Sequence, residues 1–262
     1  MIQSSKLDNQ LIVIKTSKNK YLAVVDFNKE FVTNEGKFTF KNISSIPSKI
    51  TSSTGIEFKL YKPTYKEFVL LMKRGPQIIY PKDSAQILIE ANLHSGSNVL
   101  EIGTGSGALT LLLFTIISSL GTLTTLDISK NNQRRAQKTI SRYLTSIQHE
   151  KNTNLTYLNC ELESFNFDEI SNLVDTIITD VPEPWLFFEN NKIVNTTNWV
   201  SYLPSISQIS KIKETLIKNE FEDIEVKEVI LRDWIIEDKI MRPSNKLVSH
   251  TGFIISGKFI KF

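Results

Sequence analysis

The sequence predicts an α/β fold with a mostly parallel sheet, preceded by a small N-terminal β-domain. After residue 98, strand-like and helix-like segments alternate, which is typical of βαβ units. A glycine-rich loop joins the first of these strands to the helix that follows it. The first sixty or so residues instead hold short strand-like runs separated by turn residues. We therefore expect two domains, at residues 1–63 and 64–262.

The composition is that of a globular protein. The chain has 262 residues, of which 40% are hydrophobic, and its formal net charge of +3 is too small for a disordered class. A single cysteine, Cys160, excludes an intrachain disulfide and a cysteine-rich zinc site, and it favours a reducing compartment. No apolar run approaches the roughly 18 to 20 residues that span a bilayer. The N-terminus does not have the pattern of a signal peptide. We expect a cytoplasmic protein with no membrane partner and no metal.

The N-terminal part is rich in Val, Ile, Phe, Tyr and Thr. Its predicted strands are 11–16, 21–27, 37–40 and 57–61. Thr64 is a suitable N-cap for a first helix. A second helix is expected to begin near Pro81, since proline suits the first turn.

The remaining chain alternates apolar runs with amphipathic stretches. The predicted strands are 98–102, 123–128, 155–159, 176–180 and 199–203, and the predicted helices are 106–120, 131–147 and 206–218. The segments 224–231 and 251–260 read as two strands with no helix between them. We expect them to form an antiparallel hairpin at the sheet edge.

The glycine loop fits two cofactors. The spacing from Gly103 through Gly105 to Ala108 satisfies the dinucleotide fingerprint G-x-G-x-x-A. The run from Glu101 through Gly107 resembles instead the E-x-G-x-G-x-G loop of class I methyltransferases, which bind S-adenosylmethionine. The acid Glu101 would suit the ammonium of that cofactor. The loop alone does not decide between them.

Acidic residues also stand at the ends of the following strands. Asp127 lies at a distance from the loop that suits hydrogen bonds to ribose hydroxyls, which both cofactors possess. Glu161 follows the third strand, where many methyltransferases place an acid against adenine. Asp180 follows the fourth strand, at the edge where open α/β sheets bind ligands. Prolines and Trp185 come next and would form a rim suited to a planar base.

At this point the chain resembles the tRNA (adenine-N1)-methyltransferases that modify the T-loop, in their single-subunit archaeal and bacterial form. The resemblance covers about residues 57 to 260. Its matching segments are RGPQIIYPKD at 74–83, the glycine loop, Asp180 with Pro184-Trp185, SYLP at 201–204, MRP at 241–243 and SHTGF at 249–253. It implies a class I S-adenosylmethionine-dependent methyltransferase (Rossmann-like) domain after the small β-domain.

The resemblance also implies roles for individual residues. S-adenosylmethionine would be bound by Glu101, Gly103, Gly105, Ser106, Gly107, Ala108, Leu109, Asp127, Asn132, Glu161 and Asp180. Asp180 would also engage the target adenine, Tyr80 and Tyr202 would flank it, and Trp185, His250 and Thr251 would complete the substrate site. The partner would be tRNA, with phosphate contacts from surface cations such as Arg74, Lys82 and Arg242. The family's tetramer would let subunits share one tRNA.

The expected reaction is a direct displacement in which N1 of adenine attacks the methyl group of the sulfonium. No proton leaves N1 first, so alignment and stabilisation of the growing positive charge matter more than a strong base. The sequence alone leaves three alternatives open. They are an NAD-dependent oxidoreductase using the same loop, a non-catalytic tRNA-binding subunit, and a methyltransferase acting on a small molecule or a protein.

Overall fold

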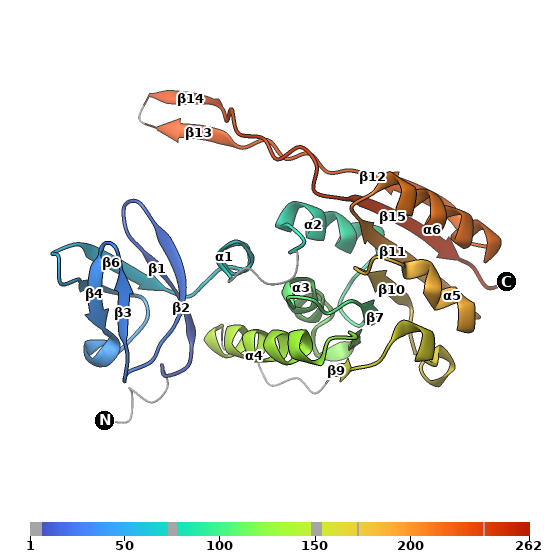
Figure 1. Ribbon diagram of the computed structural model, residues 1–262, viewed down its shortest axis with the longest axis horizontal. Helices are drawn as coiled ribbons and strands as arrows, with labels where there is room; N and C mark the ends of the chain where they lie inside the picture. The colour runs from blue at the N-terminus through green and yellow to red at the C-terminus, as the bar shows by residue number, and fades with distance from the viewer. Residues whose placement is uncertain (1–6, 73–77, 148–153, 172, 238) are drawn as a thin grey trace. The chain divides into compact units, whose positions relative to one another are not determined.

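The computed structural model describes residues 7–72, 78–147, 154–171, 173–237 and 239–262 (Figure 1). The chain divides into two compact units. Residues 1–75 and 137–151 form the first, and residues 76–136 and 152–262 form the second. The domain boundary after residue 63 stays a prediction. The first unit adds to residues 1–63 a short helix and the C-terminal half of a long one.

The first unit is built on an antiparallel sheet of four strands in the order β2-β1-β6-β5. Its strands are β1 (Leu11–Lys15), β2 (Lys20–Val24), β5 (Ser48–Thr51) and β6 (Glu57–Tyr61), and a separate hairpin is formed by β3 (Glu30–Thr33) and β4 (Gly36–Thr39). The four predicted strands are confirmed. β3 and β5 were missed because each has only four residues, at least half of them polar or charged, and so short a run carries too little alternation to be recognised.

Alternation of side chains gives this unit its own core. One hydrophobic cluster contains the buried side chains of Ile12, Ile14, Phe58 and Leu60. It also contains the aromatic side chains of β4 and of the 3-10 turn η2 (Phe40–Asn42). Helix α1 (Tyr65–Leu71) has Thr64 as its N-cap, as predicted. The Thr64 hydroxyl accepts from the Glu67 amide, and the Glu67 carboxylate accepts from the Thr64 amide. This capping box satisfies two otherwise unpaired groups at the helix start.

The second unit contains a seven-stranded sheet in the order β12-β15-β11-β10-β7-β8-β9. Five strands from β11 to β9 are parallel, as predicted, and β15 pairs antiparallel with both β11 and β12. The strands are β7 (Asn98–Ile102), β8 (Thr122–Leu126), β9 (Leu155–Leu158), β10 (Thr176–Thr179), β11 (Thr197–Leu203), β12 (Glu222–Lys227) and β15 (Phe253–Phe259).

Helices cover both faces of this sheet. Figure 1 shows α2 and α3 on one side and α5 and α6 on the other. Their bounds are α2 (Pro81–Glu90), α3 (Ala108–Ile117), α5 (Phe187–Asn190) and α6 (Ile206–Lys218), and α4 (Lys130–Ser146) follows β8. Helix α3 starts two residues later than predicted because Gly107 precedes it in the left-handed region, with φ 79°. Short 3-10 turns complete the unit: η3 (Ser118–Leu120), η4 (Leu162–Ser164), η5 (Phe167–Glu169) and η6 (Pro184–Leu186).

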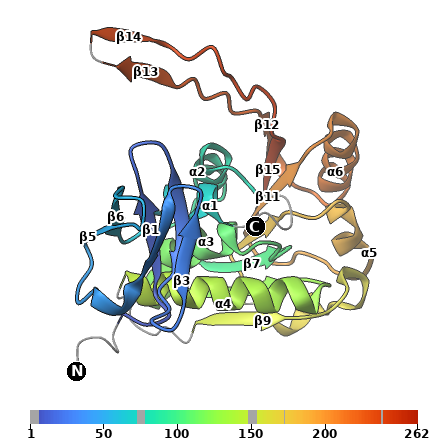
Figure 2. The same ribbon diagram turned by 60° about the vertical axis from the view of Figure 1, so that its left-hand side comes forward.

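The tail contains more than the predicted edge hairpin. β12 and β15 pair antiparallel as expected, and a further hairpin, β13 (Trp234–Glu237) with β14 (Ile240–Pro243), lies between them in the chain. Figures 1 and 2 show this hairpin at the end of an arm that leaves the sheet. Its two short strands are flanked by irregular segments, so the sequence did not reveal them.

The order of the strands locates the site. The chain runs from β7 outward through β8 to β9, and then returns to β10 on the other side of β7. The strand order therefore reverses between β7 and β10. Open α/β sheets bind ligands at such a reversal, beyond the carboxyl ends of the strands.

Candidate active site

A pocket of about 250 Å³ lies beyond the carboxyl ends of β7, β8 and β10. It is lined by the glycine loop, the ends of these strands, and the turns that follow β9 and β10. Its lining residues are Ile102, Gly103, Gly105, Leu126, Asp127, Ile128, Cys160, Leu162, Glu163, Asp180, Val181, Pro182, Glu183 and Leu186.

Two residues of the glycine loop, Gly103 and Gly105, line this pocket. Gly103 has φ 104° and Gly105 has φ 51°, conformations that favour glycine. A Cβ on Gly103 would overlap the backbone oxygen of Asp180, whereas a Cβ on Gly105 would meet no atom within 4 Å. Gly103 therefore allows close packing of two strand ends, and Gly105 leaves open space beside the pocket.

Asp127 lines the pocket with a carboxylate that the backbone already orients. Its Oδ2 accepts from the Gly105 amide at 2.8 Å, and its Oδ1 accepts from the Ser129 amide at 2.7 Å. The loop and the acid at the end of β8 thus form one rigid feature. Each carboxylate oxygen keeps a further lone pair for a ligand hydroxyl.

Asp180 stands at the end of β10, with its amide bonded to the carbonyl of Ile102 at 2.8 Å. Burial, reinforced by the charge of Asp127, raises the pKa of the Asp180 carboxyl to about 7. A carboxyl in such surroundings responds strongly to a nearby positive charge or hydrogen-bond donor. This is the environment expected of a group with a chemical role.

Glu101 is fully buried behind the loop and is not among the lining residues. Its Oε2 accepts from Thr110 Oγ1 and Thr125 Oγ1, both at 2.6 Å. Burial raises the pKa of Glu101 to about 8, with added repulsion from Asp180 and Asp127. Within the described part of the chain, its Oε1 has no hydrogen-bond partner. The carboxyl therefore joins β7 to α3 and to β8.

Tyr202 belongs to β11, the strand beside β10. Thr179 pairs with Ser201, so Asp180 and Tyr202 occupy the next positions on the two strands. Tyr202 is 4% exposed, and its hydroxyl donates to the carbonyl of Thr251 at 2.6 Å. Burial raises the pKa of the Tyr202 phenol, which therefore stays protonated. Tyr80, by contrast, is 44% exposed and precedes the first residue of α2.

The other residues assigned by resemblance lie at varied positions around the loop. Gly107, Ala108 and Leu109 are buried at the start of α3, and Ser106 Oγ accepts from the Ala108 amide at 3.3 Å. None of these, nor Asn132, Glu161 or Trp185, lines the pocket as the structure describes it. Trp185 is 9% exposed in the core, with Lys211 Nζ 4.0 Å from its ring centroid. Their assigned roles stay predictions.

Two acids in the lining, Glu163 and Glu183, were not recognised from the sequence. Glu163 comes from the turn η4, two residues after the exposed Glu161. Glu183 precedes η6. An acid soon after a strand of the parallel sheet was the available signal, but it gives no side-chain direction.

His250 and Thr251 lie between the hairpin arm and β15. His250 Nδ1 is 2.6 Å from Glu228 Oε1, and its Nε2 is 3.0 Å from the carbonyl of Pro204. Glu228 raises the pKa of His250 by favouring the charged ring. Arg74 and its neighbours up to Gln77 lie outside the described residues, so its predicted phosphate contact stays a prediction.

The charge of the pocket discriminates between the two cofactors. Four carboxylates line it, from Asp127, Glu163, Asp180 and Glu183, and none of its described lining residues is Lys or Arg. Such a lining repels a pyrophosphate and attracts a cation. Apolar side chains, including Ile128, Leu162 and Leu186, provide contacts for a flat base. The pocket fits S-adenosylmethionine better than a dinucleotide.

Comparison with known families agrees with this geometry. The family model described as "tRNA methyltransferase complex GCD14 subunit" matches residues 58–251. The chain belongs to this family. Named relatives include a methyltransferase from Methanocaldococcus jannaschii, the tRNA (adenine(57)-N(1)/adenine(58)-N(1))-methyltransferase TrmI. It is 32% identical to this chain, over 94% of this chain and 93% of its own length. The tRNA (adenine(58)-N(1))-methyltransferase TrmI of Thermus thermophilus is 28% identical over 79% of both chains.

Solved structures of methyltransferases are also similar to this chain. It is similar to the tRNA (m1A58) methyltransferase TrmI from Aquifex aeolicus, with a TM-score of 0.78, 26% identity and coverage of 97% of this chain and 98% of that one. An S-adenosylmethionine-dependent O-methyltransferase from Thermotoga maritima has a TM-score of 0.86 at 21% identity, covering 99% and 97%. At that identity the likeness shows the fold alone. The expected fold class is confirmed.

Proposed function

We propose that this chain is a tRNA (adenine-N1)-methyltransferase that acts on the T-loop in the cytoplasm. The observation that carries the proposal is an acidic pocket at the β7–β10 reversal, with the half-buried carboxyl of Asp180 beside the glycine loop. The target is adenosine 58. Adenosine 57 is a second target, since the relative from M. jannaschii is named for both positions.

The cofactor is S-adenosylmethionine, and its residues are proposed from the pocket. When bound, it supplies an electrophilic methyl group. Asp127, which the loop already orients, accepts hydrogen bonds from the ribose hydroxyls. Ile128 and Leu162 contact the adenine, and Glu163 lies on its polar edge. Glu161, two residues earlier, is assigned to the adenine by resemblance alone and lies outside the pocket lining. The negative lining as a whole favours the cationic cofactor.

Asp180 acts on the target base. As N1 of adenine gains a bond, positive charge spreads to the N6 amino group. The Asp180 carboxylate accepts a hydrogen bond from N6 and stabilises that charge as it forms. Its backbone is fixed by the bond to Ile102, so the carboxylate needs little reorganisation. It then accepts the surplus N6 proton, a step that its pKa of about 7 suits.

The two tyrosines position the flipped adenine. The target lies within a folded tRNA and must leave its stack to enter the pocket, at a cost of a few kcal/mol. The exposed ring of Tyr80 provides a stacking surface that offsets this cost. Tyr202, on the strand beside Asp180, closes the opposite side of the base. Lys82 is not available to phosphates in this scheme because its ammonium is buried in protein contacts.

The assembly is proposed to be a homotetramer, with the β13–β14 hairpin as a contact between copies. Trp234 pairs with Pro243 and Ile236 with Met241, so one face of the hairpin is apolar. Trp234 is 58% exposed, and Ile236 and Met241 are each 69% exposed. A two-stranded hairpin is only marginally stable by itself, and such a face favours burial against a second copy. Ile236→Lys should lower the mass measured by light scattering, whereas Leu120→Lys, at another exposed apolar position, should not.

The test of the activity is methyl transfer from labelled S-adenosylmethionine to an unmodified tRNA transcript, followed by nucleoside analysis. The proposal predicts labelled N1-methyladenosine. A different methylated nucleoside would assign another reaction. Binding of tRNA without transfer would instead identify a non-catalytic subunit. Tight binding of NAD with no binding of S-adenosylmethionine would restore the dinucleotide interpretation of the loop.

A further inference from the structure

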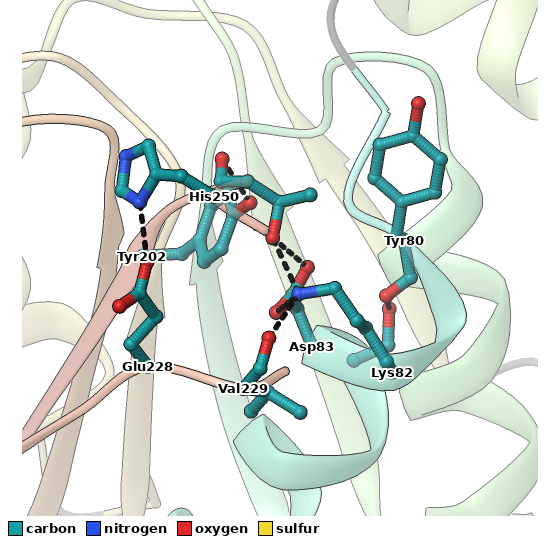
Figure 3. Close-up of polar contacts among 9 residues, drawn as sticks. Tyr80, Lys82, Asp83, Tyr202, Glu228, Val229 and His250 are labelled. Carbon is teal, nitrogen blue, oxygen red and sulfur yellow. Dashed lines mark hydrogen bonds and ion pairs between the residues drawn. The ribbon is translucent and has the colours of Figure 1, made fainter. Parts of the chain in front are cut away.

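A buried ion pair lies in the first turn of α2, outside the cofactor pocket. Lys82 and Asp83 are adjacent in the chain, and their side chains are 8% and 0% exposed. Lys82 Nζ lies 2.8 Å from Asp83 Oδ1, 2.6 Å from the carbonyl of Val229 and 2.6 Å from Thr251 Oγ1 (Figure 3). An ammonium has three donors, and all three are used.

The three partners come from segments far apart in the sequence. Val229 lies just after β12, where the chain leaves the sheet toward the β13–β14 hairpin, and Thr251 lies just before β15, where the chain returns. The single ammonium of Lys82 therefore binds both the outgoing and the incoming segment. We call these two segments, 228–229 and 250–252, the root of the hairpin.

Thr251 extends this network toward the proposed target base. Its hydroxyl donates to Asp83 Oδ2 at 2.7 Å, and its carbonyl accepts from the Tyr202 hydroxyl at 2.6 Å (Figure 3). The next residue, Gly252, lies so close to the Tyr202 ring that a Cβ there would be 2.5 Å from it. The position of the root and the position of the Tyr202 phenol are thus fixed together.

His250 joins the same two segments a second time. Its ring lies between Glu228 on the outgoing side and the carbonyl of Pro204, which follows β11. Glu228 and Val229 are neighbours, as are His250 and Thr251. Displacement of the root would therefore move the His250 ring together with the Tyr202 hydroxyl.

Because the Lys82–Asp83 ion pair is buried, the network needs each of its hydrogen-bonding partners. A buried ammonium or carboxylate is tolerated only while its partners satisfy it, and removing one partner leaves the other uncompensated. Neither Lys82, Asp83 nor Thr251 lines the cofactor pocket. The network is placed to act on the substrate side alone.

We propose that Lys82 and Asp83 are positioning residues that hold the hairpin root, and through Thr251 set the Tyr202 hydroxyl and the His250 ring beside the target adenosine. This inference rests on the proposed function for its effect on catalysis. Tyr80, which precedes this turn of α2, accepts at its carbonyl from the amides of Asp83 and Ser84. The first turn of α2 therefore contacts the backbone of Tyr80 directly and the Tyr202 hydroxyl through Thr251. These are the two tyrosines proposed to flank the base.

The network can be tested with matched variants. Thr251→Val removes the hydroxyl while keeping the shape, and Thr251→Ser restores the hydroxyl. Lys82→Met removes the ammonium. Lys227→Met is the control, because Lys227 joins Glu90, the last residue of α2, at 2.8 Å, and Glu90 also accepts from Ser256 of β15. That ion pair links the same helix to β12 and β15 without contacting the root.

We expect Thr251→Val and Lys82→Met to lower kcat/KM for tRNA at least tenfold, with the Kd for S-adenosylmethionine changed less than twofold. Lys227→Met should stay within threefold of the unsubstituted protein, and Thr251→Ser should recover most of the activity that Thr251→Val loses. Wild-type transfer by Lys82→Met and Thr251→Val would overturn the proposal, as would a parallel loss of cofactor binding. If Lys82→Met does not fold, the comparison of Thr251→Val with Thr251→Ser tests the proposal by itself.

Hydrogen exchange of the free protein provides a reading that is independent of activity. Amides at residues 250–252 should exchange at least tenfold faster in Thr251→Val, and those of α6 should not change. Unchanged exchange at the root would contradict the anchoring role. If the unsubstituted protein transfers no methyl group to tRNA, the proposed function fails, and exchange alone then decides whether the network holds the root.

Discussion

Gly103 and Asp180 pack so closely that a Cβ on the glycine would overlap the backbone oxygen of the acid. The glycine loop and the proposed catalytic carboxylate are thereby held in fixed relation. Gly103→Ala should displace Asp180 and also strain a backbone with φ 104°. We expect at least a hundredfold fall in methyl transfer, measured in single turnover. Gly105→Ala is the comparison, because a Cβ there meets no protein atom and should leave Asp180 in place. A loss of methyl transfer in Gly105→Ala would then reflect the space needed by the cofactor.

Asp180→Asn should keep the shape of the site and lose its charge. Because the carboxylate stabilises charge that develops during the reaction, the single-turnover rate should fall about 100- to 1000-fold, as when one preorganised group is removed elsewhere. The Kd for S-adenosylmethionine, measured by calorimetry, should change little. A single-turnover rate equal to that of the unsubstituted protein would exclude this role for Asp180.

The pH dependence of the rate follows from the same carboxyl. Burial raises its pKa to about 7, so a growing fraction is protonated as the pH falls through that value. Only the ionised form accepts from N6, so the single-turnover rate should fall toward acid with a midpoint at or below about 7. A bound cation favours the ionised form and lowers the midpoint. The profile of Asp180→Asn should be flat across this range.

Glu101 should make stability fall as the pH rises. Its pKa is raised from 4.5 to about 8 in the folded protein, so the folded state holds a proton that the unfolded state has lost. Its contribution is complete below about pH 4.5 and is lost as the pH rises through about 8. Glu101→Gln removes this contribution to stability, because an amide does not titrate. The free energy of unfolding of the variant, relative to the unsubstituted protein, should increase between pH 5 and 8 in denaturant titrations.

The capping box of the first unit offers a test of local structure. Thr64→Ala removes the hydroxyl that accepts from the Glu67 amide at 3.2 Å. The expected loss is about 1 kcal/mol of unfolding free energy. Thr64→Ser should retain most of it. Methyl transfer at low temperature should be unchanged in both variants, because Thr64 is not part of the proposed site.

Elements with a strong local signal were predicted well from the sequence. The expected bounds of β7 and α6 agree with the structure, because β7 is almost wholly buried and α6 has an N-cap, Ser205, whose side chain accepts from the Ser207 amide. The acids Asp127 and Asp180 were also found, since strand ends in a parallel sheet converge on one edge.

Features that depend on tertiary packing were not predicted. The β13–β14 hairpin exposes its apolar side chains, so its pattern does not match a strand packed on a core. The burial of Lys82 and Asp83 arises from two segments whose contacts lie 147 and 169 residues after Lys82 in the chain. Glu101 illustrates the same limit, because the sequence suggests an acid beside the loop and the structure turns it toward Thr110 and Thr125.

The reaction proposed for this chain is methylation of N1 of adenosine 58 in tRNA. The most direct measurement compares labelled methyl transfer to an unmodified tRNA transcript with transfer to the same transcript carrying guanosine at 58. We expect N1-methyladenosine in the first and loss of the label at 58 in the second, leaving at most methylation at 57. Equal labelling of both transcripts at another position, or no transfer to either, would contradict it.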